Sequence, residues 1–236
     1  MTQAFSNELI TQLQNNRWFS VLPQHLQSYI LQHAQLKQYQ KDEALFHFGD
    51  PFTGIFGLLS GSVQLSYNDQ DGAHAVTAIV EPIMWMGEIS LIDEQPRSHD
   101  AICMQKSIVL HLNHRMIDHI LERYPKFWFH IAQLTSQKLR LLFSELISIQ
   151  TQSLKRRIAH RLWMILNGYG NHICIHQAFV HISQEQLANM LFCARQSVNQ
   201  ELRHLEDEHI IKVHFKKIEI LDVIRLEQLA KNILQV

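Results

Sequence analysis

Cysteine is scarce in this chain of 236 residues, which contains only three, and they lie far apart. An odd number of separated cysteines argues against a disulfide framework and predicts a reducing, cytoplasmic environment. No run of about 18 apolar residues occurs, so we expect no membrane-spanning helix. The N-terminus has no basic region followed by an apolar stretch, so no secretory signal is predicted.

Patterns typical of metal sites and catalysis are also missing. The 16 histidines are scattered, and no C-x-x-C pair occurs. His172 and His176 are close in sequence, but the apolar residues between them indicate a strand. No nucleophile–base pair or pair of spaced carboxylates indicates an active site. We therefore expect no metal site and no enzymatic activity.

Apolar residues make up 46% of the sequence, which is enough for packed cores. The net charge is −1, but from Ser153 onward 11 basic residues face 8 acidic ones. A mildly basic C-terminal third suits binding of a polyanion.

The first half of the chain changes period at about Tyr39. Residues 6–36 have helical spacing, and short strand-like runs separated by glycine follow. Asp71-Gly72 is a hairpin signal between two such runs. Short strands at this spacing predict a small antiparallel β-roll.

Within this predicted roll, Gly87 and Glu88 open a short apolar helical turn, and Arg97-Ser98 follows. A glycine allows close backbone approach, a helix N-terminus attracts anions, and arginine clamps phosphate. Together, these residues are suited to binding a phosphate-bearing sugar. The alternative is a buried Glu88–Arg97 ion pair that fixes the loop. A nucleotide-hydrolysing site is less favoured, because no second carboxylate stands beside Glu88.

A helix without glycine or proline is predicted from about Lys126 to Gln150. Spacings of four and three residues predict a heptad seam for a paired helix. The alternative is one wide core-facing stripe in a monomer. The predicted dimer-interface residues are Trp128, Thr135, Leu139, Leu142, Leu146 and Ile149.

The segment from 182 to 206 predicts two short helices around a tight turn at Phe192-Cys193. Ser183 and Gln186 form a capping-box pattern. A basic-tipped hairpin centred on 211–214 and 218–221 follows, which favours a winged helix-turn-helix over a surface helix pair. The polar face of the second helix suits base edges and phosphates and carries Arg195, Gln196, Ser197, Asn199 and Gln200.

These motifs resemble the cyclic-AMP receptor protein/fumarate–nitrate regulator (CRP/FNR) family of bacterial transcription regulators. The resemblance covers nearly the whole chain after residue 20. Its carriers are K-D-E-A-L-F-H-F-G-D, G-E-I-S-L-I-D-E-Q-P-R-S, the heptad helix, R-R-I-A-H-R-L and the helix pair. It implies an α+β fold with N-terminal helices and an effector-sensing, jelly-roll-like β-roll at 1–125, a dimerisation helix at 126–152, and a winged helix-turn-helix at 153–236. It also implies a homodimer on a near-palindromic duplex DNA operator, with RNA polymerase as a further partner.

By the same resemblance, Arg195 reads guanine, while Ser183, Ser197 and Lys216 contact phosphate. Gln196 and Gln200 stand where relatives often carry glutamate and arginine, which predicts a shift toward A·T pairs there. A second interpretation is a ligand-sensing module whose helix-turn-helix contacts protein rather than DNA.

The resemblance further implies a cyclic nucleotide, cyclic AMP or cyclic GMP, held by Gly87, Glu88, Arg97 and Ser98. Two departures bear on this effector: His99 replaces a small residue, and Leu142-Phe143 replaces an adenine-contacting Thr-Ser pair. The first hundred residues contain no cysteine, which argues against an iron–sulfur cluster. Haem bound through a histidine stays open as an alternative.

Overall fold

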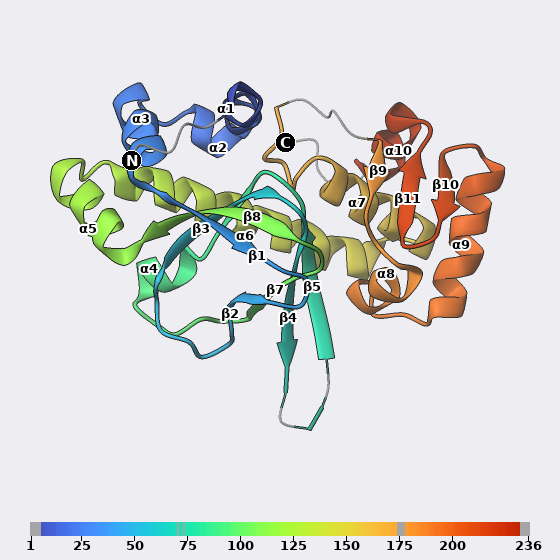
Figure 1. The fold of residues 1–236 in the computed structure, drawn as a ribbon. Helices are drawn as coiled ribbons and strands as arrows, with labels where there is room; N and C mark the ends of the chain where they lie inside the picture. The colour runs from blue at the N-terminus through green and yellow to red at the C-terminus, as the bar shows by residue number, and fades with distance from the viewer. Residues whose placement is uncertain (1–5, 70, 73, 174–177, 232–236) are drawn as a thin grey trace.

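The computed structural model describes residues 6–69, 71–72, 74–173 and 178–231. A β-roll capped by N-terminal helices lies on one side, and a helical domain with a small sheet lies on the other. One long helix runs across the middle of the view, behind strands of the roll, toward the helical domain (Figure 1). This order agrees with the predicted α+β fold.

Three short helices open the chain: α1 (Asn7–Gln14), α2 (Arg17–Ser20) and α3 (Gln24–His33). The indole of Trp18 in α2 donates to the carbonyl of His130 in the long helix at 2.6 Å. Trp18 also packs against Trp85 of the roll, with ring centroids 5.0 Å apart. The N-terminal helices are thus joined to both the roll and the long helix.

The roll consists of two four-stranded antiparallel sheets, in the orders β1-β8-β3-β6 and β2-β7-β4-β5. Its interior is apolar and aromatic; for example, His111 stacks on Phe56 with centroids 4.4 Å apart. The predicted hairpin joins β4 to β5. The strands are β1 (Gln35–Tyr39), β2 (Ala44–Phe46), β3 (Gly54–Ser60), β4 (Val63–Asn68), β5 (His74–Val80), β6 (Met84–Met86), β7 (Asp100–Cys103) and β8 (Ser107–Asn113).

Three helices complete this half: α4 (Ile89–Asp93), α5 (His114–Arg123) and α6 (Phe127–Thr151). The last is the predicted long helix. One face of α6 is buried through Phe127, Ile131 and Leu134.

The C-terminal half begins with α7 (Leu154–Leu166). It continues with β9 (Phe179–Val180), α8 (Gln184–Met190), α9 (Arg195–Asp207), β10 (Ile211–His214), β11 (Lys217–Ile220) and α10 (Val223–Ala230). The three strands form one sheet in the order β10-β11-β9. Of the strand predicted at 172–175, His172 forms an isolated bridge with Asn16, and residues from 174 lie outside the described ranges.

The two halves share a buried boundary. The Tyr169 hydroxyl, just after α7, donates to the carbonyl of Ile79 in β5 at 2.8 Å and accepts from the Ile79 amide at 3.1 Å. His181 forms an ion pair with the buried carboxylate of Glu81 at 2.9 Å, and this hydrogen bond raises the pKa of His181. The helix-turn-helix domain is therefore docked on its own roll.

Candidate nucleic-acid interface and effector cassette

The helix pair begins with a complete capping box. The Ser183 hydroxyl accepts from the Gln186 amide at 3.1 Å, and the Gln186 side-chain oxygen accepts from the Ser183 amide at 3.0 Å. The pattern predicted at these two residues is therefore confirmed. The bonds satisfy two free N–H groups and fix the start of α8.

The turn between α8 and α9 is stabilised by a contact from α7. Phe192 has a left-handed backbone with φ +52°, which reverses the chain over a short distance. The Arg157 guanidinium in α7 donates to the carbonyl of Leu191 at the end of α8. Since α7 packs against this turn, the angle between α8 and α9 is set by the core of the domain.

Helix α9 buries one face and exposes the other. Val198, Leu202 and Leu205 are buried. The polar face is solvent-exposed at Arg195, Gln196, Ser197 and Gln200, whereas Asn199 is half-buried. The exposed side chains are suited to hydrogen bonding with base edges.

The wing is the β10–β11 hairpin. His214 pairs with Lys217, so Phe215 and Lys216 form the turn. The Glu206 carboxylate in α9 accepts from the amide of Val213 at 2.7 Å. This bond fixes the wing relative to α9.

Three of the predicted DNA-binding residues come together at one hollow of about 310 Å³. Ser183 comes from the start of α8, Arg195 from the start of α9 and Lys216 from the wing tip. A hydroxyl, a guanidinium and an ammonium are the groups that bind phosphate oxygens. Glu185 also lines the hollow, and the sequence reasoning did not single it out.

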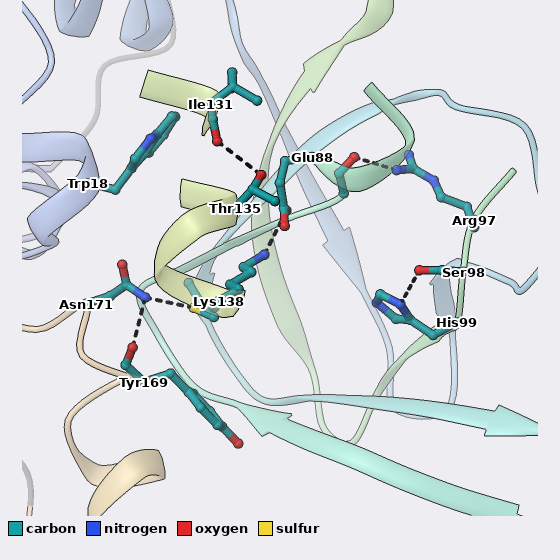
Figure 2. A network of polar contacts seen from close by, with 12 residues as sticks. Trp18, Glu88, Arg97, Ser98, His99, Ile131, Thr135, Lys138, Tyr169 and Asn171 are labelled. Atoms are coloured by element: carbon teal, nitrogen blue, oxygen red, sulfur yellow. Dashed lines mark hydrogen bonds and ion pairs between the residues drawn. The ribbon is translucent and has the colours of Figure 1, made fainter. Parts of the chain in front are cut away.

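The effector cassette lies at the other end of the roll, where Figure 2 shows Glu88, Arg97, Ser98 and His99 near α6. Gly87 has φ +100°, and a Cβ there would lie 2.8 Å from an Arg97 nitrogen. Glycine is therefore required at 87. Glu88 follows as the N-cap of α4, with only 1% of its surface exposed.

The carboxylate of Glu88 binds the Lys138 ammonium of α6 at 2.7 Å (Figure 2). The loop-fixing Glu88–Arg97 ion pair, considered as an alternative, is not formed among the described residues. Lys138 was not predicted as a site residue, because nothing in the sequence links positions 50 residues apart. The only signal is its place one helical turn before Leu142.

Arg97 is engaged by the roll itself. Its guanidinium donates to the carbonyls of Gly87 at 3.0 Å and Gly54 at 2.8 Å, and lies 4.4 Å from the Phe46 ring centroid. Burial lowers the pKa of Arg97 to about 10, so it stays cationic at neutral pH. The Ser98 hydroxyl is hydrogen-bonded to the His99 ring at 2.9 Å.

Three buried polar atoms of this cassette have no hydrogen-bond partner within the described structure: Glu88 Oε1, Arg97 Nε and His99 Nε2. Burial is also the main cause that lowers the pKa of His99. Unpaired buried polar groups are costly, so these three atoms can each take a further hydrogen-bond partner, such as a polar ligand or water. Leu142, in contrast, has 61% of its surface exposed, so the single chain does not bury it within the cassette.

The predicted seam of α6 is exposed in the single chain. The exposed fractions are 44% for Trp128, 52% for Leu139, 61% for Leu142, 54% for Leu146 and 38% for Ile149. Thr135 is half-buried and donates to the Ile131 carbonyl at 3.1 Å. A continuous apolar stripe exposed on one helix marks an interaction surface.

The winged helix-turn-helix, joined by a long helix to a roll with this cassette, defines a DNA-binding transcription regulator. Residues 36–124 match the model of the cyclic nucleotide-binding domain, and residues 156–229 match the model of the Crp-like helix-turn-helix domain. These two matches, taken together, cover most of the chain. The chain belongs to the CRP/FNR family of transcription regulators.

Individual relatives agree with this assignment. The chain is 25% identical over 201 residues to the cyclic AMP receptor protein of Thermus thermophilus, covering 85% of this chain and 90% of the relative. It is 22% identical over 198 residues to the cAMP-activated global transcriptional regulator CRP of Pasteurella multocida, covering 80% and 91%.

Solved structures share the fold. FixK2 from Bradyrhizobium japonicum superposes with a TM-score of 0.70 at 16% identity, covering 83% of this chain and 96% of its own. A CRP/FNR-family transcriptional regulator from Thermus thermophilus has a TM-score of 0.65 at 22% identity, covering 84% and 100%.

Neither a membrane-spanning helix nor a metal-binding cluster is present among the residues that the structure describes. No helix there is both long and apolar enough to cross a membrane. The same part of the chain holds no group of three or more His, Cys, Asp or Glu side chains placed to bind a metal ion.

Proposed function

We propose that this protein is a homodimer that binds a near-palindromic DNA operator and regulates transcription under the control of a small molecule in the roll. The hollow shared by Ser183, Arg195 and Lys216 carries the proposal, because it gathers phosphate ligands beside the exposed polar face of α9. Arg195 contacts guanine, and Gln196 and Gln200 favour adenine.

The remaining side chains on this surface have simpler roles. Ser183, Ser197 and Lys216 bind phosphate oxygens and set the position of α9 on the duplex. Asn199, half-buried on α9, supports the base contacts of its neighbours. RNA polymerase is the further partner through which the bound dimer acts.

The dimer forms through the exposed stripe of α6. Pairing of Leu139, Leu142 and Leu146 with their copies removes apolar surface from water and places two α9 helices about one helical turn of DNA apart. Trp128, Thr135 and Ile149 extend the same seam.

The effector proposal rests on the cassette. Its unpaired buried atoms fit a small polar ligand of the cyclic-nucleotide class, with a sugar hydroxyl on Glu88 and an anionic group near Arg97, Ser98 and His99. Lys138 binds Glu88 Oε2, so a hydroxyl on the unpaired Oε1 shares the carboxylate with Lys138. Because Lys138 belongs to α6, ligand binding there shifts the helix that joins the two halves and thereby re-aims α9.

DNA binding is tested with an operator selected from random duplexes by the wild-type protein. Arg195→Ala is expected to weaken binding by about 5- to 150-fold, which corresponds to about 1–3 kcal/mol for a bidentate contact. Arg123→Ala, an exposed arginine on α5, is the charge-matched control and should leave affinity unchanged. Absence of any salt-sensitive DNA binding by wild type would favour the protein-contact interpretation instead.

Effector binding is tested by calorimetric titration with cyclic AMP and cyclic GMP. We expect heat with one of them, and we expect Glu88→Gln to abolish it. An absorption spectrum checks for haem in the same sample. Absence of heat with both nucleotides would contradict the effector proposal without affecting DNA binding.

A further inference from the structure

The turn of the wing carries two large, exposed side chains where small residues are usual. Phe215 has 87% of its surface exposed. Lys216 has a left-handed backbone with φ +56°, a conformation in which glycine or asparagine costs least. Neither residue contributes to the core of the domain, so folding does not account for this pair.

The charges around Phe215 are those of a DNA-binding surface. The Lys216 ammonium lies 5.4 Å from the Phe215 ring centroid. Lys217, the next residue, lies 4.5 Å from the Phe179 ring centroid, and Lys212 on β10 is exposed. An isolated aromatic ring among lysines matches a polyanion with apolar sugar and base surfaces.

The position of Phe215 follows from the hollow that it lines together with Ser183, Arg195 and Lys216. A phosphate strand seated on these three residues borders the major groove that receives α9. The same strand borders the neighbouring minor groove on its other side. A side chain at the wing tip therefore reaches that minor groove.

We propose that Phe215 is an apolar wedge that enters the minor groove flanking each half-site and packs against sugar and base edges. The inference rests on the proposed DNA binding and adds a recognition element outside α9. Phenylalanine is among the side chains that architectural proteins insert between base steps.

The wing is built to hold such a wedge firmly. His214, beside the turn, has its ring nitrogen 2.7 Å from the Glu219 carboxylate on the opposite strand. The Glu206–Val213 bond holds β10 against α9 close to the same turn. Ile218 and Ile220 are buried beneath the hairpin. A rigid hairpin lets an exposed ring enter the groove without a large ordering cost.

The test compares Phe215→Ala, Lys216→Ala and Ile224→Ala on the selected operator at several salt concentrations. Ile224 is a matched control, since it is 67% exposed on α10 of the same domain. Phe215→Ala is expected to weaken binding about 10- to 100-fold with an unchanged salt slope, because the lost contact is apolar. Lys216→Ala should reduce the slope by about 0.9. Ile224→Ala should change neither quantity.

A second readout places the ring on the DNA. With 2-aminopurine at the steps flanking a half-site, wild type should raise the fluorescence by unstacking the probe, and Phe215→Ala should not. If Phe215→Ala binds the operator with an affinity within twofold of wild type while Arg195→Ala binds more weakly, the proposal of an apolar wedge is wrong and the proposed function stands. If wild type shows no salt-sensitive DNA binding, both are wrong.

Discussion

The Tyr169 hydroxyl is expected to hold the helix-turn-helix domain on the roll. It donates to the Ile79 carbonyl and accepts from the Ile79 amide, at 2.8 and 3.1 Å. β5 is an edge strand, so the outward groups of Ile79 have no strand to pair with. Burial raises the pKa of Tyr169 to about 12, so the hydroxyl remains a donor across the working pH range.

Tyr169→Phe keeps the ring and removes both bonds. Each buried backbone group left without a partner costs about 1–3 kcal/mol. Some water reaches the edge strand after the change, so we expect a total of about 2–4 kcal/mol against the docked arrangement. That cost falls on the boundary between the two halves and leaves the apolar core of each half intact.

Hydrogen exchange measures the part of this cost that falls on the Ile79 amide. A local loss of about 1–3 kcal/mol predicts exchange about 5- to 150-fold faster in Tyr169→Phe. Tyr67→Phe is the control, because Tyr67 is 38% exposed on β4 of the same sheet. If the Ile79 amide exchanges within twofold of wild type, the hydroxyl does not hold the boundary.

Three further outcomes are expected. Lys138→Met leaves the Glu88 charge buried and unpaired, so denaturant unfolding should show a loss of about 3–5 kcal/mol, largely restored by adding Glu88→Gln. Burial lowers the pKa of His111 to about 4, so the unfolded chain takes up this proton first as pH falls. The contribution of neutral His111 to the free energy of unfolding is therefore fully present above about pH 6.5 and declines toward pH 4 by at most about 3 kcal/mol. In His111→Phe, the midpoint of denaturant unfolding should depend less on pH over this range. Leu146→Glu places a charge on the seam and should give monomers by analytical ultracentrifugation; a wild-type-like dimer would contradict the assigned interface.

Sequence reasoning succeeded where one local pattern decides the structure. Helix α6 begins and ends within about one residue of its predicted bounds, because that stretch keeps helical spacing and contains no glycine or proline. The same reasoning assigned no strand at β6 and β7, which lie on either side of the predicted helical turn at Gly87-Glu88. Strands of three and four residues that are mostly buried show no polar alternation. Helix α10, which packs against α7, was not predicted either.

The candidate site was also predictable only in part. The capping box at Ser183 is a local pattern that the sequence predicts, whereas the partner of Glu88 depends on how α6 lies against the roll. Arg97 was expected to be available for an anion. Its terminal nitrogens are instead bonded to backbone carbonyls, which carry no sequence signature. Residue types at the cassette were therefore predictable, while their pairing was not.

The docked arrangement also predicts the direction in which DNA affinity responds to Tyr169→Phe. Ser183 and Lys216 line, on one side, a cavity of about 710 Å³, and Gln64 of the roll lines the other. Gln64 therefore faces Ser183 and Lys216 across this cavity. We expect a duplex that contacts these residues to require the domain to leave the roll.

Apparent affinity is proportional to the fraction of released protein, so weakening the docked state should tighten operator binding. We expect Tyr169→Phe to lower the apparent Kd by at least about fivefold, measured by fluorescence anisotropy against wild type and Tyr67→Phe. Unchanged or weaker binding would mean that the docked state is itself the DNA-binding state. The roll would then have to lie beside the duplex rather than compete with it.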